Sequence, residues 1–525
     1  MTQRIGTPTG PARHLGRFAV VWSGQAITLV GNSVLRFAFV VHAWSSGQQA
    51  TQVVLLALCG VLPQVMLSPT AGALVDRFRK RTALRLADLG GLLVVSGLTI
   101  VYFSGQLQLW QIYLTAALLG ATAAVQYPAL LSAVPLLVDE EHLQRANGLL
   151  GTARSTAEVG GPALAGVLIE TSGLGAVLWV DLVSFAIALV TISVVRFAEE
   201  QASPGGPRRR LVADSLDGLR YLFARPSLRG MILIVFVVNF VMVFGYAVLP
   251  PMILARTGND TTALASVLSS IGIGGIAGGL VLGAWGGPRS RIRGMLLGII
   301  GMCLTSQIAM AVSRDVVPWC VAVLAGALFM AIVNGAQQAI IQTKVPRERQ
   351  GRVFGAVMFL SQFSVPLAMA CSGPLADHVF EPQAAAGTGA VGVLRPLLGT
   401  GPGAGMAAML LLAGVCGTAV AVWGLSSRAV RDMDRLMPDI DQRGVATPAK
   451  PTTQEVEMTT NPFEDEDGSY LVLVNDENQH SLWPADIDVP DGWRIAAGPS
   501  RRADCIAYVE ANWTDIRPAS LNRST

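Results

Sequence analysis

Long apolar stretches, separated by short polar or basic breaks, dominate about the first four hundred residues of the chain. A helix needs about 20 mostly apolar residues to cross the hydrocarbon core of a bilayer. Twelve stretches reach that length and predict twelve membrane-spanning helices. They lie near residues 17–43, 51–75, 83–104, 109–131, 148–170, 174–196, 230–254, 263–285, 294–312, 317–341, 353–375 and 403–424.

The pattern changes after residue 426. Polar sequence with prolines and threonines extends to about residue 460, which is typical of a flexible linker. Strand-like patterns follow in SYLVLVN, HSLWP and GWRIAA, and RADCIAYVEANW has Ile506, Val509 and Trp513 on one side of a short helix. We therefore expect an all-α membrane protein that ends in a small α+β unit, a three-stranded antiparallel sheet with one helix.

The composition agrees with a membrane protein. Of the 525 residues, 52% are hydrophobic and 14% are charged, against about 25% charged in globular domains. A net charge of +3 does not indicate a nucleic-acid partner. The six cysteines are scattered singly, without CxxC spacing, so we expect packing roles, no metal and no cofactor. Because no Walker A sequence occurs, we do not expect ATP hydrolysis to be an energy source. The predicted membrane helices favour a transporter over an enzyme.

Basic residues are distributed unevenly over the loops. When the loops are taken alternately, one set carries most of the lysines and arginines, and the other contains only Arg256, Arg314 and Arg395. Positive charge is retained on the cytoplasmic face of a membrane. The chain is therefore predicted to lie in a bacterial cytoplasmic membrane, within the lipid bilayer, with the basic loops and both termini in the cytoplasm.

An internal repeat divides the membrane region. VDEEHLQRANG resembles VPRERQGRVFG, and the matching positions are 207 residues apart: Val138 and Val345, Arg145 and Arg352, Gly148 and Gly355. Each copy enters the fifth helix of a six-helix half. We expect a domain over residues 1–430 with pseudo-symmetric halves near 15–198 and 226–426, joined by a cytoplasmic linker at 199–225. A substrate cavity is expected between such halves.

The break after the second span carries the sequence GALVDRFRKR. Its residues Gly72, Asp76, Arg77, Lys80 and Arg81 resemble the loop signature of the major facilitator superfamily, although an arginine replaces one of the glycines usual in that family. A physical role is a gate: a helix dipole and a nearby arginine would hold Asp76 in one of two states. The alternative is that these charges only set the topology.

A second motif lies in the fifth span, AEVGGPALAGVL. Gly161, Pro162 and Gly166 resemble the glycine-proline signature of antiporters in that superfamily, which favours export over uptake. Small residues and a proline permit close helix approach and a bend in lipid. With LDGLRYLFARPSLR before the seventh span, the region near 15–430 resembles the exporter branch that includes enterobactin-type siderophore efflux proteins.

Polar residues inside predicted spans are costly in lipid and are therefore candidates for function. Arg154 and Glu158 lie four residues apart on one helix face, where they can pair. Glu158 is the main candidate for proton coupling, and the alternative is a structural ion pair. Further candidates for coupling or substrate contact are Asp181, Arg36, Asn32, Asn239, Asn334 and Gln337. Asp181 and Arg36 can instead be hydrated near the outer interface, and amides often pair one helix with another.

The terminal unit carries a much more specific pattern. NPFEDEDG, then NDENQHSLWP with PDGW five residues later, then NWTDIRPASL resemble MbtH-like proteins over residues 461–525. The resemblance implies binding to adenylation domains of nonribosomal peptide synthetases, without catalysis. It places Ser481, Leu482 and Trp483 on the contact strand, and Trp483 and Trp493 in a cleft for a partner side chain. The alternative, a tryptophan that fills the small core, applies best to Trp513.

Together these features predict a secondary exporter, driven by the proton gradient, for a small-molecule or peptide product of such a synthetase, such as a siderophore or peptide antibiotic. A linker at residues 431–460 would tether the MbtH-like module to it. Two alternatives stay open. One is a bundle without transport activity that only anchors the module, and the other is an uptake transporter.

Overall fold

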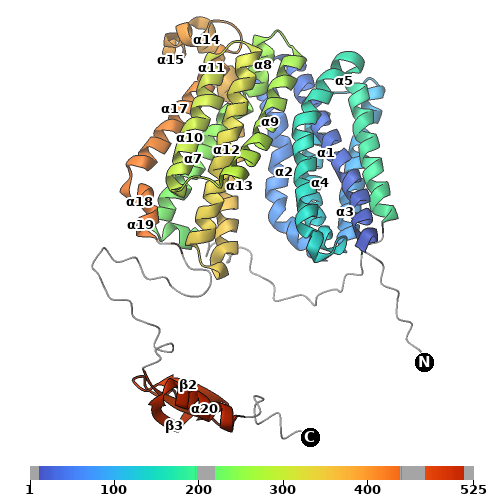
Figure 1. Cartoon of the computed structure of the whole chain (residues 1–525). Coiled ribbons are helices and arrows are strands. Elements are labelled where there is room, and N and C mark those ends of the chain that lie inside the picture. Colours follow the sequence, from blue (N-terminus) through green and yellow to red (C-terminus); the bar gives the residue numbers. More distant parts are fainter. Residues whose placement is uncertain are drawn as a thin grey trace, which may run out of the picture. The chain divides into compact units, whose positions relative to one another are not determined.

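The computed structural model describes residues 11–77, 79–195, 197, 219–437, 439 and 468–513. Two compact units divide the chain, Met1–Thr447 and Pro448–Thr525. The first is helical and the second is built around a small sheet (Figure 1).

Five long helices form the first half of the membrane unit. They are α1 (Pro11–Gly47), α2 (Ala50–Arg77), α3 (Lys80–Phe103), α4 (Leu109–Ala133) and α5 (Leu143–Val194), with short helices η1 (Val134–Leu136) and η2 (Glu140–His142) before α5. The bilayer-spanning length of these helices follows from their uninterrupted apolar sequence.

Helix α5 crosses the bundle twice. Its 52 residues would extend about 78 Å at 1.5 Å per residue, against a hydrocarbon core of about 30 Å. The helix breaks at Gly173, whose φ of 73° and ψ of −173° favour glycine. Figure 1 shows the resulting hairpin. The described residues contain eleven apolar helical segments long enough to span a membrane, and the double crossing of α5 accounts for the twelve predicted spans.

The second half contains more interruptions. Its elements are α7 (Pro226–Ala247), α8 (Leu249–Arg256), α9 (Thr261–Trp285), α10 (Arg291–Met302), the π-helix η3 (Cys303–Ala309), α11 (Met310–Val312), α12 (Val316–Lys344), α13 (Arg347–Leu375), the π-helix η4 (Ala376–Phe380), α14 (Glu381–Ala386), α15 (Gly389–Val393), α16 (Arg395–Leu398), α17 (Ala404–Ser426), α18 (Arg428–Arg431) and α19 (Met433–Leu436). Several short elements continue one another, so that Pro226–Arg256, Arg291–Val312 and Arg349–Ala386 each form one apolar segment.

The hydrophobic cores show how the halves meet. We call the end with Lys80, Arg291 and Lys344 the basic end, and the end with Trp44 and Asp377 the opposite end. At the opposite end one buried core contains residues of both halves. Toward the basic end the first half has its own core and the second half has another. The two halves are therefore joined at the opposite end and separate toward the basic end.

The bounds predicted for the two linkers differ from those in the structure. Tyr221 and Leu222, placed in the central linker 199–225, are instead buried in the core of the second half, because the apolar side of this amphipathic segment belongs to that core. The second linker was predicted to begin at residue 431, but Met433 is fully buried and Asp439 binds Arg291. Residues 199–218 and 440–460 lie outside the described residues.

The second unit is an antiparallel sheet with one helix. Strands β1 (Ser469–Asn475), β2 (His480–Pro484) and β3 (Trp493–Arg501) pair in the order β2-β1-β3, and α20 (Arg502–Asn512) follows. Tyr470, Val472 and Cys505 form the core between β1 and α20. The predicted strands and helix are thus present, but Cys505 makes the buried helix contact, with Tyr508 and Val509 only partly buried.

Candidate functional site

Polar contacts join the two halves at the opposite end. The indole Nε1 of Trp44 in α1 donates to Oδ1 of Asn259, before α9, at 2.7 Å. The carboxylate of Asp377 in η4 accepts from the backbone N–H groups of Ala50 (2.9 Å) and Thr51 (2.7 Å), the first residues of α2. A carboxylate placed there satisfies free amide groups and complements the positive end of the helix dipole. A polar cavity of about 540 Å³ lies beside these contacts.

The glycine-proline motif lies where α5 meets α1 and α9. Gly161 packs against Ser33 of α1, and a Cβ on Gly166 would lie 3.0 Å from that of Ala265 in α9. Pro162 is buried within α5. Nearby, Ser269 of α9 donates to the carbonyl oxygen of Val159 at 2.8 Å. The motif residues therefore lie at close contacts within the first half and between the halves.

Four predicted charged candidates come together in the first half. Arg154 Nε and Glu158 Oε1 are 3.2 Å apart, and their side chains are 65% and 55% exposed. The Arg154 guanidinium lies 6.0 Å from the ring centroid of Tyr127 in α4. Arg36 of α1 is solvent-accessible and interacts electrostatically with Asp181, Glu158 and Arg154. Charges avoid lipid, so the exposed members Arg36, Arg154 and Glu158 are expected to face water rather than lipid.

Asp181 is the buried member of this group. Its side chain is 0% exposed, and Oδ1 accepts a long hydrogen bond from Ser184 Oγ at 3.5 Å. Gly31 of α1 packs directly against both side chains. Oδ2 is buried and has no hydrogen-bond partner among the described residues. An unsatisfied buried carboxylate oxygen is costly, which makes Asp181 a site where a proton would stabilise the bundle.

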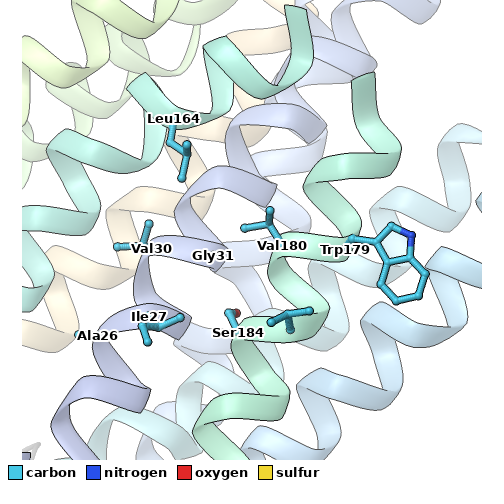
Figure 2. Close-up of a pocket in the computed structure, with 9 residues that line it drawn as sticks. Ala26, Ile27, Val30, Gly31, Leu164, Trp179, Val180 and Ser184 are labelled. Atoms are coloured by element: carbon cyan, nitrogen blue, oxygen red, sulfur yellow. The ribbon is translucent and has the colours of Figure 1, made fainter. Parts of the chain in front are cut away.

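An apolar crevice of about 560 Å³ lies beside Asp181, between α1 and both arms of α5 (Figure 2). Ile27, Val30 and Leu164 contribute to its walls, and Trp179 lies at its rim. Trp179 is 52% exposed, so the crevice opens to the outer surface of the bundle. Ser184 has the only hydroxyl group in the lining. The crevice therefore suits an acyl chain better than a polar substrate.

The predicted amides differ in environment. Asn239 of α7 donates to the carbonyl oxygen of Ser361 (2.7 Å) and to Ser364 Oγ (2.5 Å) in α13. It therefore pairs two helices, the alternative that the sequence left open. Asn32 and Gln337 are partly exposed and Asn334 is exposed, and the described residues provide no hydrogen bond to their side chains. These three remain candidates for substrate contact.

Part of the gate motif binds a helix end in the first half. Nε and Nη2 of Arg81 donate to the carbonyl oxygens of Ile192 (3.1 Å) and Ser193 (2.6 Å), at the end of α5. A base at this position satisfies free carbonyl groups and complements the negative end of the dipole. Lys80 begins α3. Gly72, Asp76 and Arg77 belong to α2, but their side chains lie outside the described residues, so the proposed two-state contact of Asp76 stays a prediction.

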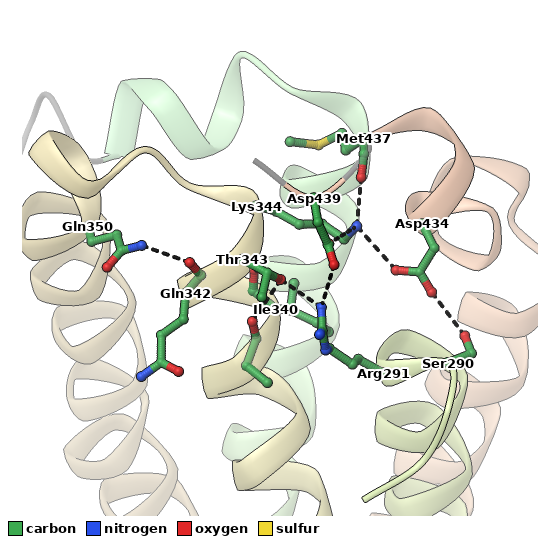
Figure 3. Close-up of polar contacts among 11 residues, drawn as sticks. Ser290, Arg291, Ile340, Gln342, Thr343, Lys344, Gln350, Asp434, Met437 and Asp439 are labelled. Carbon is green, nitrogen blue, oxygen red and sulfur yellow. Dashed lines mark hydrogen bonds and ion pairs between the residues drawn. The ribbon is translucent and has the colours of Figure 1, made fainter. Parts of the chain in front are cut away.

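In the second half, acids from the chain after the last span meet the bases at the basic end (Figure 3). The Lys344 side chain is 1% exposed, and Nζ lies 3.2 Å from Asp434 Oδ1 and 3.1 Å from Asp439 Oδ1. It also donates to the carbonyl oxygen of Met437 at 2.6 Å. Nη1 of Arg291 binds Asp439 Oδ2 at 3.0 Å. The loop GAWGGPRSRIRG has bases without an acid, and this tail supplies the acids.

One buried charged residue was missed by the sequence reasoning. Asp88 of α3 is 0% exposed and binds Gln25 and Gln126. The signal was present, because the predicted span at 83–104 contains a single acid at this position.

In the second unit, the predicted contact residues divide between the two faces of the sheet. Trp483 pairs with Leu471 and Trp493 with Asn475. Because side chains alternate along a strand, both tryptophans lie on the face away from Tyr470 and α20, with Ser481 on the same face. Leu482 instead pairs with Val472 and packs in the core. Trp513 lies 5.8 Å from the ring of His480, and Thr514 to Pro518 lie outside the described residues.

Comparison with known proteins assigns both units. The model of the Major Facilitator Superfamily matches residues 21–369, and that of MbtH-like proteins matches residues 459–525. Macrolide efflux protein A of Streptococcus pyogenes is 25% identical over 366 residues, 69% of this chain and 90% of that protein. The multidrug efflux pump Tap of Mycolicibacterium fortuitum is 26% identical over 362 residues, 66% of this chain and 86% of that protein.

A solved structure supports the fold. A bacterial homologue of the human lysosomal transporter Spinster, crystallised in an inward-facing and unoccupied conformation, superposes with a TM-score of 0.58. The superposition covers 79% of this chain and 98% of that structure, at 16% sequence identity. At this identity the similarity concerns the arrangement of the helices alone.

Proposed function

Because the chain belongs to the Major Facilitator Superfamily and ends in an MbtH-like domain, we propose that it is a proton-coupled exporter tied to nonribosomal peptide synthesis. Its cargo is a peptide product such as a siderophore or peptide antibiotic. The observation that carries the transport proposal is the charged group of Arg36, Arg154, Glu158 and Asp181 within a bundle whose halves share a buried core at one end only. The names of the relatives, efflux proteins for macrolides and several drugs, support export of a bulky amphipathic compound.

In this proposal the basic end faces the cytoplasm, where positive loops are retained. The described conformation is then open toward the cytoplasm and closed outside, ready to accept cargo. Protonation of Glu158 would release Arg154 and weaken the attraction of Arg36 to this side of the cavity. A change of one charge at such a group alters which conformation is favoured. The proton gradient would in this way supply the energy for export.

The second unit has the features of a binding module. Trp483, Trp493 and the 56%-exposed Ile495 lie on the sheet face not covered by α20. Partly buried aromatic anchors of this kind are typical of protein interfaces, and the resemblance to MbtH-like proteins indicates an adenylation domain as the partner. A tethered module raises the local concentration of the synthetase at the exporter, toward the millimolar range for short flexible tethers.

The test separates transport from anchoring. The full chain and Glu158→Gln are expressed in a macrolide-sensitive bacterium without its main efflux pump, and accumulation of labelled erythromycin is followed with and without a protonophore. We expect the wild type to lower accumulation and the variant to lose this effect. Both should co-purify equally with an adenylation domain that needs an MbtH-like protein for solubility. Asp315→Asn, at an exposed loop position, is the matched control.

Each alternative predicts a different result. If the bundle is only an anchor, wild-type cells accumulate the macrolide as cells without the protein do, while adenylation-domain binding persists. If it is an uptake transporter, accumulation rises. Loss of co-purification with intact efflux would instead contradict the role proposed for the second unit.

A further inference from the structure

The side chains of Asp88, Gln25 and Gln126 form a closed hydrogen-bonded ring. Nε2 of Gln25 in α1 donates to Asp88 Oδ2 at 2.8 Å, and Nε2 of Gln126 in α4 donates to Asp88 Oδ1 at 2.6 Å. Gln126 Nε2 also lies 3.3 Å from Gln25 Oε1. Asp88 therefore connects α1, α3 and α4, and each of its carboxylate oxygens has an amide donor.

Among the residues whose side chains are described, no cation balances this carboxylate, and only the amides of Gln25 and Gln126 act on it. The described side chains of α1, α2, α4 and α5 include no lysine, arginine, histidine or second acid that acts on Asp88. The side chains of Arg13, Asp76 and Arg77 lie outside this described part. The nearest base along α3, Arg85, donates to the carbonyl oxygen of Ser193 in α5.

This environment favours a bound proton. An ionised carboxylate buried without a counter-charge costs several kcal/mol, whereas a protonated acid costs much less. Both protonation states have hydrogen-bond partners, since a glutamine side chain can turn its oxygen toward an acidic O–H. The oxygen and nitrogen positions of such amides are assigned from the network, so Gln25 and Gln126 fit either state.

We propose that Asp88 is a proton-binding site of the first half and that Gln25 and Gln126 transmit its protonation state to α1 and α4. The site is distinct from the charged group described above. Gln25 and Arg36 are eleven residues apart on α1, about 16 Å along the helix axis. α1 thus contacts a buried acid near the basic end and the exposed charges further along. The proposal rests on proton-coupled transport as the function of the bundle.

The first experiment detects the proton itself. Infrared difference spectra of the purified full chain in lipid, recorded between neutral and acidic pH, should contain the carbonyl band of a buried protonated acid. Asp88→Asn should remove the component of this band that comes from Asp88 and leave that of the other buried acid, Asp181, while Asp315→Asn should leave the whole band unchanged. Gln25→Leu should shift its frequency, because one hydrogen bond to the acid is lost. A spectrum of Asp88→Asn identical to the wild type would overturn the proposal, whether or not transport is observed.

The second experiment measures coupling in proteoliposomes with labelled erythromycin. Asp88→Asn should lose uptake driven by an imposed pH gradient but keep exchange of labelled for unlabelled macrolide, and Asp88→Glu should restore part of the driven uptake. Retained exchange shows that the variant is folded. Driven uptake by Asp88→Asn at the wild-type rate would overturn the proposal. If the wild type moves no macrolide, the proposed export of such compounds fails, and the infrared band alone decides the role of Asp88.

Discussion

Asp377 Oδ2 accepts a 2.7 Å hydrogen bond from the backbone N–H of Thr51, across the interface between the two halves of the bundle. The two residues are 326 positions apart. The acceptor lies in η4 of the second half, and the donor lies in the first turn of α2 in the first half. A single carboxylate thus caps a helix of the other half at the end where the halves share one core.

Removing this cap should weaken the closed state of the opposite end. Asp377→Ala deletes two acceptor bonds at a helix N-terminus, worth about 1–2 kcal/mol. The ratio of closed to open molecules should then fall about 5- to 30-fold. The readout is maleimide labelling of a cysteine introduced by Ala265→Cys, a position 5% exposed between the halves, in nanodiscs with the six native cysteines replaced.

Asp315 provides the matched control for this measurement. It precedes α12 at the same end but makes no side-chain capping bond, so Asp315→Ala should leave the labelling rate at the wild-type value. Equal rates for Asp377→Ala and wild type would mean that apolar packing and the Trp44–Asn259 hydrogen bond keep this end closed without the cap.

The second prediction concerns the sheet face of the MbtH-like domain. Trp483→Ala and Trp493→Ala should each weaken binding of an adenylation domain by about 2 kcal/mol or more, roughly 30-fold in Kd, because aromatic anchors dominate such interfaces. Isothermal calorimetry on the detergent-solubilised full chain measures the effect. Arg494→Ala is the control, since Arg494 is exposed and adjacent but pairs with Val474 on the other face. Equal losses in all three variants would exclude this face as the specific surface.

The spans and strands could be predicted because their signal is local. Apolar length determines a membrane helix, and alternation determines a half-buried strand. The pair of Arg154 and Glu158 follows from helical spacing in the same way. Contacts between distant elements have no such signal. The sequence around Asp377 does not reveal that it caps α2, and the polar composition after residue 426 does not reveal that Asp439 neutralises a buried lysine.

The third prediction is a dependence of stability on pH. Burial of Asp439 opposes its ionisation, but hydrogen bonds from Lys344 and Arg291 outweigh this effect, so the pKa of Asp439 lies below its ordinary value. A lowered folded-state pKa adds stability above the unfolded pKa, near 4, and this stability is lost as pH falls through the folded value. Thermal unfolding between about pH 6 and 3 should show it.

The Asp439→Asn variant should remove this contribution. Because Asp439 is 52% exposed, we expect the variant to lose about 1 kcal/mol or less of unfolding free energy at neutral pH. Its stability should also decrease less steeply than that of the wild type as the pH falls. Asp432→Asn removes a surface carboxylate beside Arg431, Arg435 and Arg293. Solvent screens such surface pairs, so this variant should stay close to the wild-type curve. If the stability of Asp439→Asn decreases as steeply in acid as that of the wild type, other carboxylates are responsible for the acid sensitivity.

The last prediction places the functional end of the membrane unit after Asp439. A chain ending at residue 430 lacks Asp434, Met437 and Asp439, and so leaves the ammonium group of Lys344, 1% exposed in the full chain, without its carboxylate partners. Loss of the partners of a buried charge costs about 3–5 kcal/mol. A chain ending at Thr447 keeps all three residues. We therefore expect the longer truncation to purify as a stable monodisperse protein and the shorter one to unfold at markedly lower temperature. Lys344→Met in the shorter chain should restore most of the lost stability, because it removes the unpaired charge. If the shorter chain is as stable as the longer one, the tail is a passive tether, and the linker begins where its composition first changes.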